Sequence, residues 1–330
     1  MPFDITRRNV IAAGAAAAML PFAGRSVVAQ GAWPTKPIKI IAGFPAGGQT
    51  DLFSRSYGEY IARQLGQPVV VENKTGAGGS VAAIEVKRAA PDGYTLMVTN
   101  TATIMTNPAW MKDIGYDVAK DFVMISMMPS GSLPLVASEK TGAKNLKEFI
   151  DYAKKTEKVS IGTYAAGSYA HVAIEELNKQ YGLKMEAVHY RGEAPMWADL
   201  AGQSIDAAIG SYLASLPVLQ TGKGRAVAVS RKRMSVLPDV ATLQEQGATS
   251  RAHTLMTFQC CVAPVATSPE IVRKLSELFV AAGKSDKIQE MLKSQGLDEA
   301  AMPLEESQRI YKEEAPIWRE LIAALNLSPM

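Results

Sequence analysis

The chain has 330 residues, of which 47 % are hydrophobic and 20 % charged, and its formal net charge is +3. These proportions are ordinary for a globular protein. The length exceeds that at which one hydrophobic core keeps growing, so we expect two lobes or domains. The densest basic run is only Arg231-Lys232-Arg233, whereas nucleic-acid binding needs a concentrated basic stripe. We therefore expect no nucleic-acid partner.

The first thirty residues have the three parts of an export signal. Arg7 and Arg8 precede an apolar run from Val10 to Leu20, and small residues stand around Ala29. The run is too short to span a bilayer. We expect residues 1–29 to be removed by cleavage near Ala29, leaving a periplasmic protein. The paired arginines favour twin-arginine export, with the general secretory (Sec) route left open.

Apolar patterning along the chain predicts alternating strands and helices, which is typical of α/β folds with largely parallel sheets. Strands are expected at residues 38–44, 68–72, 95–99, 159–163, 205–209 and 226–229. Helices are expected at residues 52–65, 81–89, 146–156, 170–181, 194–201, 269–283, 286–294 and 304–325.

A strand, a glycine loop and a helix start occur together at residues 38–52, at 69–82 and, more loosely, at 159–172. Asp51 and Ser168 are the expected N-caps of the first and third of these helices. Helix N-termini present unpaired N–H groups, so such loops can hold an anion without a basic side chain. A plain turn is an equal alternative for the first loop, and it is the favoured interpretation of the second.

No motif for catalysis or cofactor binding emerges from the sequence. It contains no dinucleotide fingerprint, P-loop, Gly-x-Ser-x-Gly elbow or Ser-x-x-Lys pair. Cys260 and Cys261 lie in an apolar run, where buried, inert thiols are expected. The three histidines lack metal-ligand spacing, and His171 is expected to be a hydrogen-bonded structural residue. We predict no enzyme activity, no catalytic residue, no cofactor and no metal.

Short runs spread over nearly the whole chain share their order and spacing with one protein family. They are Trp33-Pro34-x-Lys36-Pro37-Ile38, Phe44-Pro45-Ala46-Gly47-Gly48-x-x-Asp51, Glu72-Asn73-x-x-Gly76-Ala77-Gly78-Gly79, Pro91-Asp92-Gly93-Tyr94-Thr95-Leu96, Gly167-Ser168-x-x-His171, Tyr190-Arg191-Gly192, Asp199-Leu200-x-Gly202-x-x-Asp206 and Leu237-Pro238-Asp239-Val240-x-Thr242. The chain thereby resembles the tripartite tricarboxylate transporter substrate-binding proteins, also called the Bug family of extracytoplasmic solute receptors.

The resemblance implies a type II periplasmic-binding-protein fold, with two α/β lobes and a ligand cleft between them. Crossings near residues 128 and 227 would give one lobe of 31–127 and 228–330 and a second of 128–227. The resemblance also implies a monomer that takes a small carboxylate and hands it to the permease subunits of a tripartite tricarboxylate-type transporter. A ligand-dependent sensory receptor that acts on a membrane signalling partner is the alternative.

The candidate ligand residues lie in two loops, in a third segment after a strand, and at two further positions in the matching runs. They are Phe44, Ala46, Gly47, Gly48, Gln49 and Asp51; Thr163, Ala166, Gly167, Ser168 and His171; Thr99, Asn100 and Thr101; and Tyr190 and Asp206. Residues 103–107 are more apolar than is usual in the family, and Ala46 replaces a common proline. We therefore hypothesise a carboxylate with an apolar or aromatic body.

Overall fold

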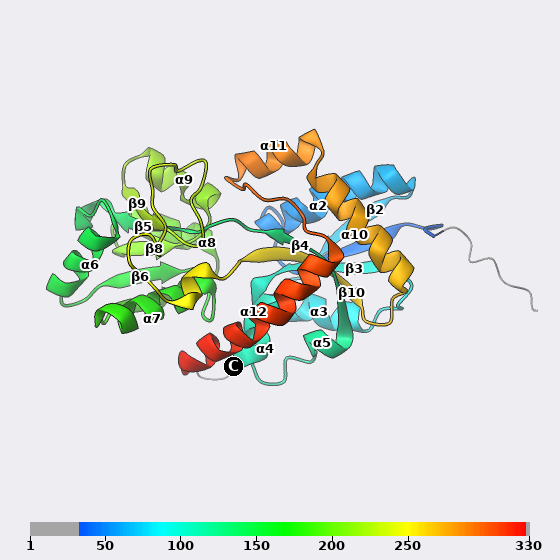
Figure 1. Ribbon diagram of the computed structural model, residues 1–330, viewed down its shortest axis with the longest axis horizontal. Helices are drawn as coiled ribbons and strands as arrows, with labels where there is room; N and C mark the ends of the chain where they lie inside the picture. The colour runs from blue at the N-terminus through cyan, green and yellow to red at the C-terminus, as the bar shows by residue number, and fades with distance from the viewer. Residues whose placement is uncertain (1–32, 328–330) are drawn as a thin grey trace, which may run out of the picture. The chain divides into compact units, whose positions relative to one another are not determined.

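The computed structural model describes residues 33–327, and the expected export signal lies outside them. One sheet has the strand order β2-β1-β3-β10-β4 (Figure 1). Its strands are β1 (Ile38–Ala42), β2 (Val69–Asn73), β3 (Thr95–Asn100), β4 (Phe122–Pro129) and β10 (Phe258–Pro264). β1 pairs in parallel with β2 and β3, whereas β10 runs antiparallel to β3 and β4.

The other sheet has the order β7-β6-β8-β5-β9. Its strands are β5 (Pro134–Ser138), β6 (Ser160–Thr163), β7 (Glu186–His189), β8 (Ala207–Ile209) and β9 (Gly224–Val229). β6 pairs in parallel with β7 and β8, and β5 runs antiparallel to β8 and β9. The two sheets therefore have the same topology, with one antiparallel strand next to an edge strand.

Helices and short turns connect the strands. The helices are α2 (Gln49–Leu65), α3 (Ser80–Lys87), α4 (Asn107–Trp110), α5 (Val118–Asp121), α6 (Leu146–Lys155), α7 (Tyr169–Tyr181), α8 (Glu193–Ala201), α9 (Tyr212–Gln220), α10 (Pro269–Gly283), α11 (Asp286–Ser294) and α12 (Leu304–Ala324). The shorter elements are η1 (Ala77–Gly79), the π-helix η2 (Ala102–Thr106), η3 (Glu139–Thr141) and η4 (Arg251–Thr254). Trp318 of α12 packs edge-on against Tyr169 of α7, with 6.4 Å between ring centroids.

The predicted strands and helices are all present, with ends that differ by a few residues. The pattern did not predict β4, β5, β7, β10, α4, α5 or α9. β4 is almost wholly buried along its length, so it lacks the apolar–polar alternation by which half-buried strands are recognised. Cys260 and Cys261 are free and buried on β10, as expected, and burial raises the pKa of both thiols.

The chain changes sheet twice. It leaves the first sheet after Pro129 and enters the second at Pro134, and the lobe boundary near residue 128 stays a prediction. The return comes well after the expected position near 227, because residues 230–254 stay attached to the second sheet and its helices. Gln246 Nε2 donates to Val227 O at 2.9 Å, and the Thr249 N–H donates to Gln180 Oε1 of α7 at 2.9 Å. The chain re-enters the first sheet only at Phe258.

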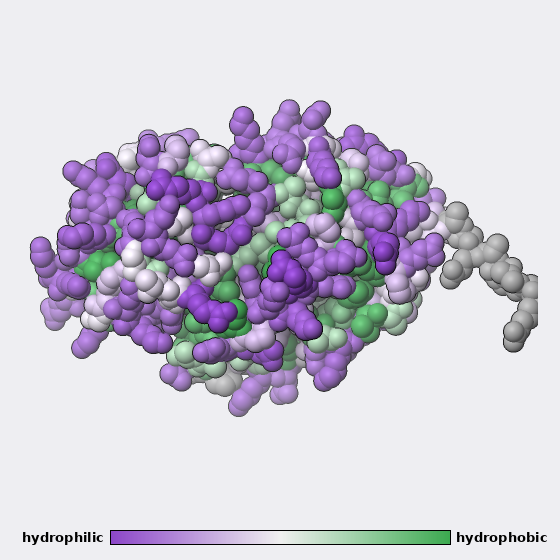
Figure 2. Space-filling model, in the orientation of Figure 1, coloured by the Kyte–Doolittle hydropathy of each residue, from purple (hydrophilic) through white to green (hydrophobic). Residues whose placement is uncertain are grey.

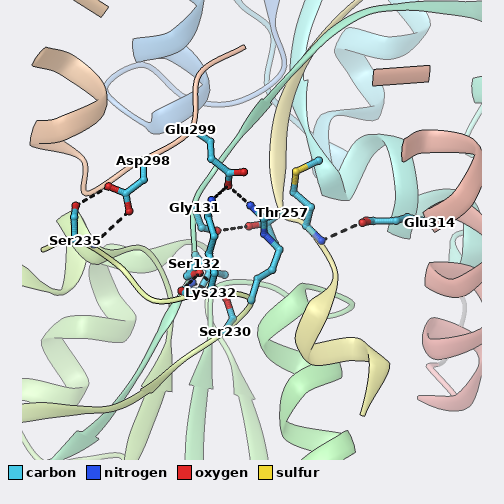
Figure 3. Close-up of polar contacts among 12 residues, drawn as sticks. Gly131, Ser132, Ser230, Lys232, Ser235, Thr257, Asp298, Glu299 and Glu314 are labelled. Carbon is cyan, nitrogen blue, oxygen red and sulfur yellow. Dashed lines mark hydrogen bonds and ion pairs between the residues drawn. The ribbon is translucent and has the colours of Figure 1, made fainter. Parts of the chain in front are cut away.

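The two crossing segments, 130–133 and 255–257, run beside each other (Figure 3). The Ser130 N–H donates to Thr257 O at 2.8 Å, and Thr257 Oγ1 donates to Gly131 O at 3.4 Å. The first crossing is also bonded to the chain after β9, where the Leu133 N–H donates to Ser230 Oγ at 2.8 Å. Each sheet thus receives its antiparallel strand, β5 or β10, directly from a crossing.

Polar and charged side chains cover most of the face drawn in Figure 2, with apolar atoms confined to small patches. No helix within residues 33–327 combines the length and apolarity needed to cross a membrane.

Candidate functional site

The loop after β1, residues 44–48, is held in shape by Asp51. Its carboxylate accepts the Gly47 N–H at 3.0 Å and Asn73 Nδ2 at 2.9 Å, and Asn73 Nδ2 also donates to Phe44 O at 2.9 Å. Burial acts to raise the pKa of Asp51, but hydrogen bonds from Arg55, Gly47 and Asn73 outweigh it and hold the pKa below its usual value. Asp51 is therefore a charged residue whose partners belong to the protein.

The prediction that Asp51 is the N-cap is wrong. α2 begins at Gln49, its N-cap is Gly48, and no side chain caps it. Asp51 stands in the first helical turn and reaches back to Gly47 instead. The N–H groups of Gln49, Thr50 and Asp51 consequently have no acceptor within the helix. They lie beside an exposed loop, and a helix N-terminus of this kind favours an anion.

The third predicted segment, after β3, has its side chains engaged within the protein. Thr99 is fully buried and its Oγ1 lies 2.6 Å from Thr103 Oγ1. Asn100 Oδ1 accepts the Ala102 N–H at 3.0 Å, and Thr101 Oγ1 accepts the Phe258 N–H at 2.8 Å. These contacts give Thr99 and Thr101 a structural part and leave the amide nitrogen of Asn100 as the group of this segment suited to a ligand.

Residues 103–107 do not support the expected apolar pocket. Ile104 and Met105 are each 2 % exposed and belong to the hydrophobic core. Asn107 Nδ2 donates to Gly78 O at 2.9 Å, within the second glycine loop. A Cβ placed on Gly79 would lie 2.2 Å from Thr103 Oγ1, so the second loop is packed closely, in line with its structural interpretation. The departure from the family pattern therefore concerns the core.

The loop after β6, residues 163–168, has the expected N-cap. The His171 N–H donates to Ser168 Oγ at 3.4 Å, and the Gly167 N–H donates to His171 Nδ1 at 3.2 Å. Because Nδ1 is an acceptor, a neutral His171 carries its proton on Nε2. This confirms Ser168 as a cap and His171 as a hydrogen-bonded residue. Ala166 lies half-buried between them and Thr163.

A second imidazole lies beside His171. The ring centroids of His171 and His189 are 4.4 Å apart, and His189 Nδ1 lies 2.8 Å from Thr163 Oγ1. Burial, and secondarily the neighbouring His189, lowers the pKa of His171 to about 4. Burial also lowers the pKa of His189. Both rings are therefore neutral at physiological pH, and this loop presents hydrogen-bonding groups without a fixed charge.

The two remaining candidates, Tyr190 and Asp206, lie at opposite ends of the strands of the second sheet. The Tyr190 N–H donates to Thr163 O at 2.9 Å, which places Tyr190 beside the loop after β6. Its hydroxyl is bonded to Asp199 at 2.7 Å. Asp206 lies beside the start of β6, at the other end of the strands. It accepts hydrogen bonds from the Ser160 N–H and from Tyr152 OH, both at 2.8 Å. The structure does not bring Asp206 together with the loops.

Sequence reasoning missed Gln259 of β10, whose side chain contacts the start of α2. Thr50 Oγ1 donates to Gln259 Oε1 at 2.6 Å, and Gln259 Nε2 donates to Gln49 Oε1 at 3.0 Å. The available signal was a single amide inside the apolar run Phe258–Val262. Buried amides need partners, so this residue marks a polar contact within the core.

Neither loop carries a charged side chain between residues 44 and 48 or between 163 and 168. The groups near these loops that can contact an anion are backbone N–H groups, the N-terminus of α2 and the neutral imidazoles of His171 and His189. The tripartite tricarboxylate transporter family receptor model (TctC) matches residues 53–327 of this chain. The chain belongs to this receptor family. Its fold is accordingly the two-lobed α/β fold of periplasmic binding proteins.

Curated and solved relatives agree with this assignment. Protein BugT of Bordetella pertussis is 30 % identical over 293 residues, which is 88 % of this chain and 89 % of BugT. The structure of R. palustris Rpa4515 with adipate has a TM-score of 0.80 at 28 % identity and covers 90 % of this chain and 100 % of its own. MatC from Rhodopseudomonas palustris with bound malate has a TM-score of 0.72 at 27 % identity, with 88 % and 100 % covered.

Proposed function

We propose that this receptor captures a small carboxylate at the loops 44–48 and 163–168 and delivers it to the permease subunits of a tripartite tricarboxylate-type transporter. The observation that carries the proposal is the start of α2, where the first N–H groups have no acceptor within the helix and adjoin an exposed, uncharged loop. Backbone donors and ordered water can hold a carboxylate there without a salt bridge.

The relatives support this ligand class. Adipate and malate, bound by Rpa4515 and MatC, are both small dicarboxylates. The family match favours transport over a sensory role. The body of the ligand stays open, because the apolar residues that suggested an aromatic acid lie in the core.

The two loops follow strands of different sheets, β1 and β6. A ligand that contacts both would favour the arrangement in which the lobes hold it together, and lobe closure would then report occupancy. We further propose that the protein acts as a monomer in the periplasm, after cleavage near Ala29, and that it has no catalytic activity.

The direct test is binding of an acid panel to the chain from residue 30 onward, unfolded and refolded to strip bound solute. The panel would contain malate, adipate, longer dicarboxylates, citrate, amino acids and aromatic acids, measured by thermal shift and titration calorimetry. The neutral diamide of adipic acid is the matched control, since it keeps the carbon chain and removes both charges. A ligand at one hundred times its Kd should stabilise the protein by about 2.7 kcal/mol.

Stabilisation by an acid and not by its diamide is the expected result. Equal binding of the two would remove the anion site from the proposal. Absence of any shift across the panel would remove the carboxylate ligand itself.

A further inference from the structure

The amide of Gln259 is buried, at 4 % exposure, and each of its hydrogen-bonding atoms has a partner. Oε1 accepts from Thr50 Oγ1 at 2.6 Å, while Nε2 donates to Gln49 Oε1 at 3.0 Å and to Ser130 Oγ at 3.3 Å. Burying an amide without hydrogen-bond partners costs several kcal/mol, so a conformation of Gln259 that lost these three bonds would be strongly disfavoured. Gln259 therefore has a defined position and orientation.

Two of these partners open α2. Gln49 and Thr50 are its first two residues, and their N–H groups are among the donors proposed for the carboxylate. Both side chains are fixed through the same amide, because Thr50 donates to it and Gln49 accepts from it. Gln259 thus sets where the start of α2 lies relative to β10.

The third partner belongs to the first crossing. Ser130 follows β4, and its N–H donates to Thr257 O of the second crossing at 2.8 Å. Thr257 in turn contacts Gly131, as Figure 3 shows. Gln259 itself stands two residues after Thr257, so one side chain joins the anion-binding helix end to both segments that connect the lobes.

We propose that Gln259 is a positioning residue of the carboxylate site, which couples the N-terminus of α2 to the crossing at Ser130. This inference rests on the proposed carboxylate function. A ligand that settles on the α2 donors shifts or fixes Gln49 and Thr50, and the amide passes that constraint to the crossing. Conversely, a displaced crossing moves the donors. A purely structural role for Gln259 would contribute to stability and leave the affinity unchanged.

Ser130 offers the sharpest test, because among the hydrogen bonds of residues 33–327 its hydroxyl contacts Gln259 and not α2 itself. Ser130→Ala removes the Ser130–Gln259 bond and leaves every α2 contact in place. The matched control is Ser126→Ala, since Ser126 is a buried serine of β4 that donates to Met302 O at 2.8 Å. Gln259→Leu removes all three amide bonds at similar volume.

Titration calorimetry and stopped-flow binding would use the acid that binds the refolded wild-type chain, with thermal unfolding measured in parallel. Both serine variants should lower the Tm by a similar amount. Ser130→Ala should weaken the affinity about tenfold, the factor that corresponds to 1.4 kcal/mol, while Ser126→Ala binds as the wild type does. Gln259→Leu should weaken it at least as much, and combining it with Ser130→Ala should add nothing further.

Equal affinities for Ser130→Ala and Ser126→Ala would overturn the coupling and leave the proposed function intact. Additive losses of affinity in the double variant would also overturn the coupling, since they would mean that Ser130 affects binding independently of Gln259. A wild-type chain that binds no acid at all would remove the proposed function and this inference together. The wild-type titration therefore separates the two failures.

Discussion

Trp110 of α4 lies directly against Gly167 of the loop after β6. A Cβ placed on Gly167 would be 2.9 Å from Trp110 Nε1, closer than such contacts allow. Gly167 also has a φ of +68°, a conformation that favours glycine. The indole nitrogen is buried without a hydrogen-bond partner in the described part of the chain. An element of one lobe thus contacts a proposed ligand loop of the other.

Gly167→Ala should therefore impair ligand binding beyond its cost in backbone strain. Gly182→Ala is the matched control, because Gly182 has a φ of +66° and an added Cβ would meet nothing within 4 Å. Both variants should lose about 1–2 kcal/mol of unfolding free energy from the left-handed conformation. Only Gly167→Ala should change the affinity for the acid and the emission of Trp110. Identical titrations of the two variants would show that the Trp110 contact has no part in binding.

Gly48 allows a second substitution that spares the backbone. Its φ is −80°, so any residue fits its conformation, and an added Cβ would meet only Pro45 O at 3.4 Å. Gly48→Leu should place a bulky group beside the α2 donors and weaken carboxylate binding by about tenfold or more, which is 1.4 kcal/mol or more.

The control for Gly48 is Gly202→Leu. Gly202 has a φ of −76°, and an added Cβ would lie 3.4 Å from Ala198 O, in a helix cap away from both loops. Thermal unfolding and calorimetry of the two variants check the prediction. Unchanged affinity in Gly48→Leu would move the carboxylate site away from this loop.

How far the site could be predicted depends on the kind of contact that fixes each residue. Ser168 and His171 were predictable, since a cap and its partner are close in sequence. Asp51 was placed one turn wrongly, because the sequence does not show that its carboxylate reaches Gly47 and Asn73 instead of capping the helix. Gln259 could not be linked to Thr50, because their contact spans 209 positions.

The fold shows the same limit. Alternating elements and loop positions follow from local patterning, and they were predicted well. The return crossing was not, because residues 230–254 have little regular structure, and single contacts such as Gln246 to Val227 O hold them on the second sheet. Ile104 and Met105 likewise suggested an apolar pocket, but they belong to the π-helix η2 and their side chains lie in the core.

Glu299 joins the chain after β9 to the segment before α12. It pairs with Arg231, and Lys232 Nζ lies 3.0 Å from its Oε2 (Figure 3). Arg231 and Glu299 are only 22 % and 23 % exposed, so Glu299→Ala would leave a largely buried guanidinium without its partner. We expect a loss of about 1–3 kcal/mol of unfolding free energy.

The control for Glu299 is Asp151→Ala. This substitution breaks an exposed pair between Asp151 and Lys147 on α6, and the urea midpoint should not change measurably. Urea unfolding of both variants is the measurement. A midpoint for Glu299→Ala as high as that of Asp151→Ala would mean that the Arg231 contact does not stabilise this junction.

His253 should make the protein less stable in mild acid. It is fully buried, and both ring nitrogens lack hydrogen-bond partners within residues 33–327. Burial lowers its pKa to about 4, against a smaller opposing effect of Glu176 on α7. The unfolded chain takes up a proton near pH 6.5, while the folded chain does not until about pH 4. The contribution of the neutral, buried His253 to the unfolding free energy is therefore fully present above pH 6.5 and is lost progressively as the pH falls toward 4.

The expected loss between pH 7 and pH 5 is about 2 kcal/mol for each histidine of this kind, and His171 contributes in the same direction. His253→Leu removes the His253 contribution and leaves those of His171 and His189, whose pKa values burial also lowers. Urea unfolding at pH 7, 6 and 5 should therefore give a shallower pH dependence in the variant than in the wild type, whatever its stability at pH 7. Parallel curves would mean that the pKa of His253 is not lowered in the folded protein.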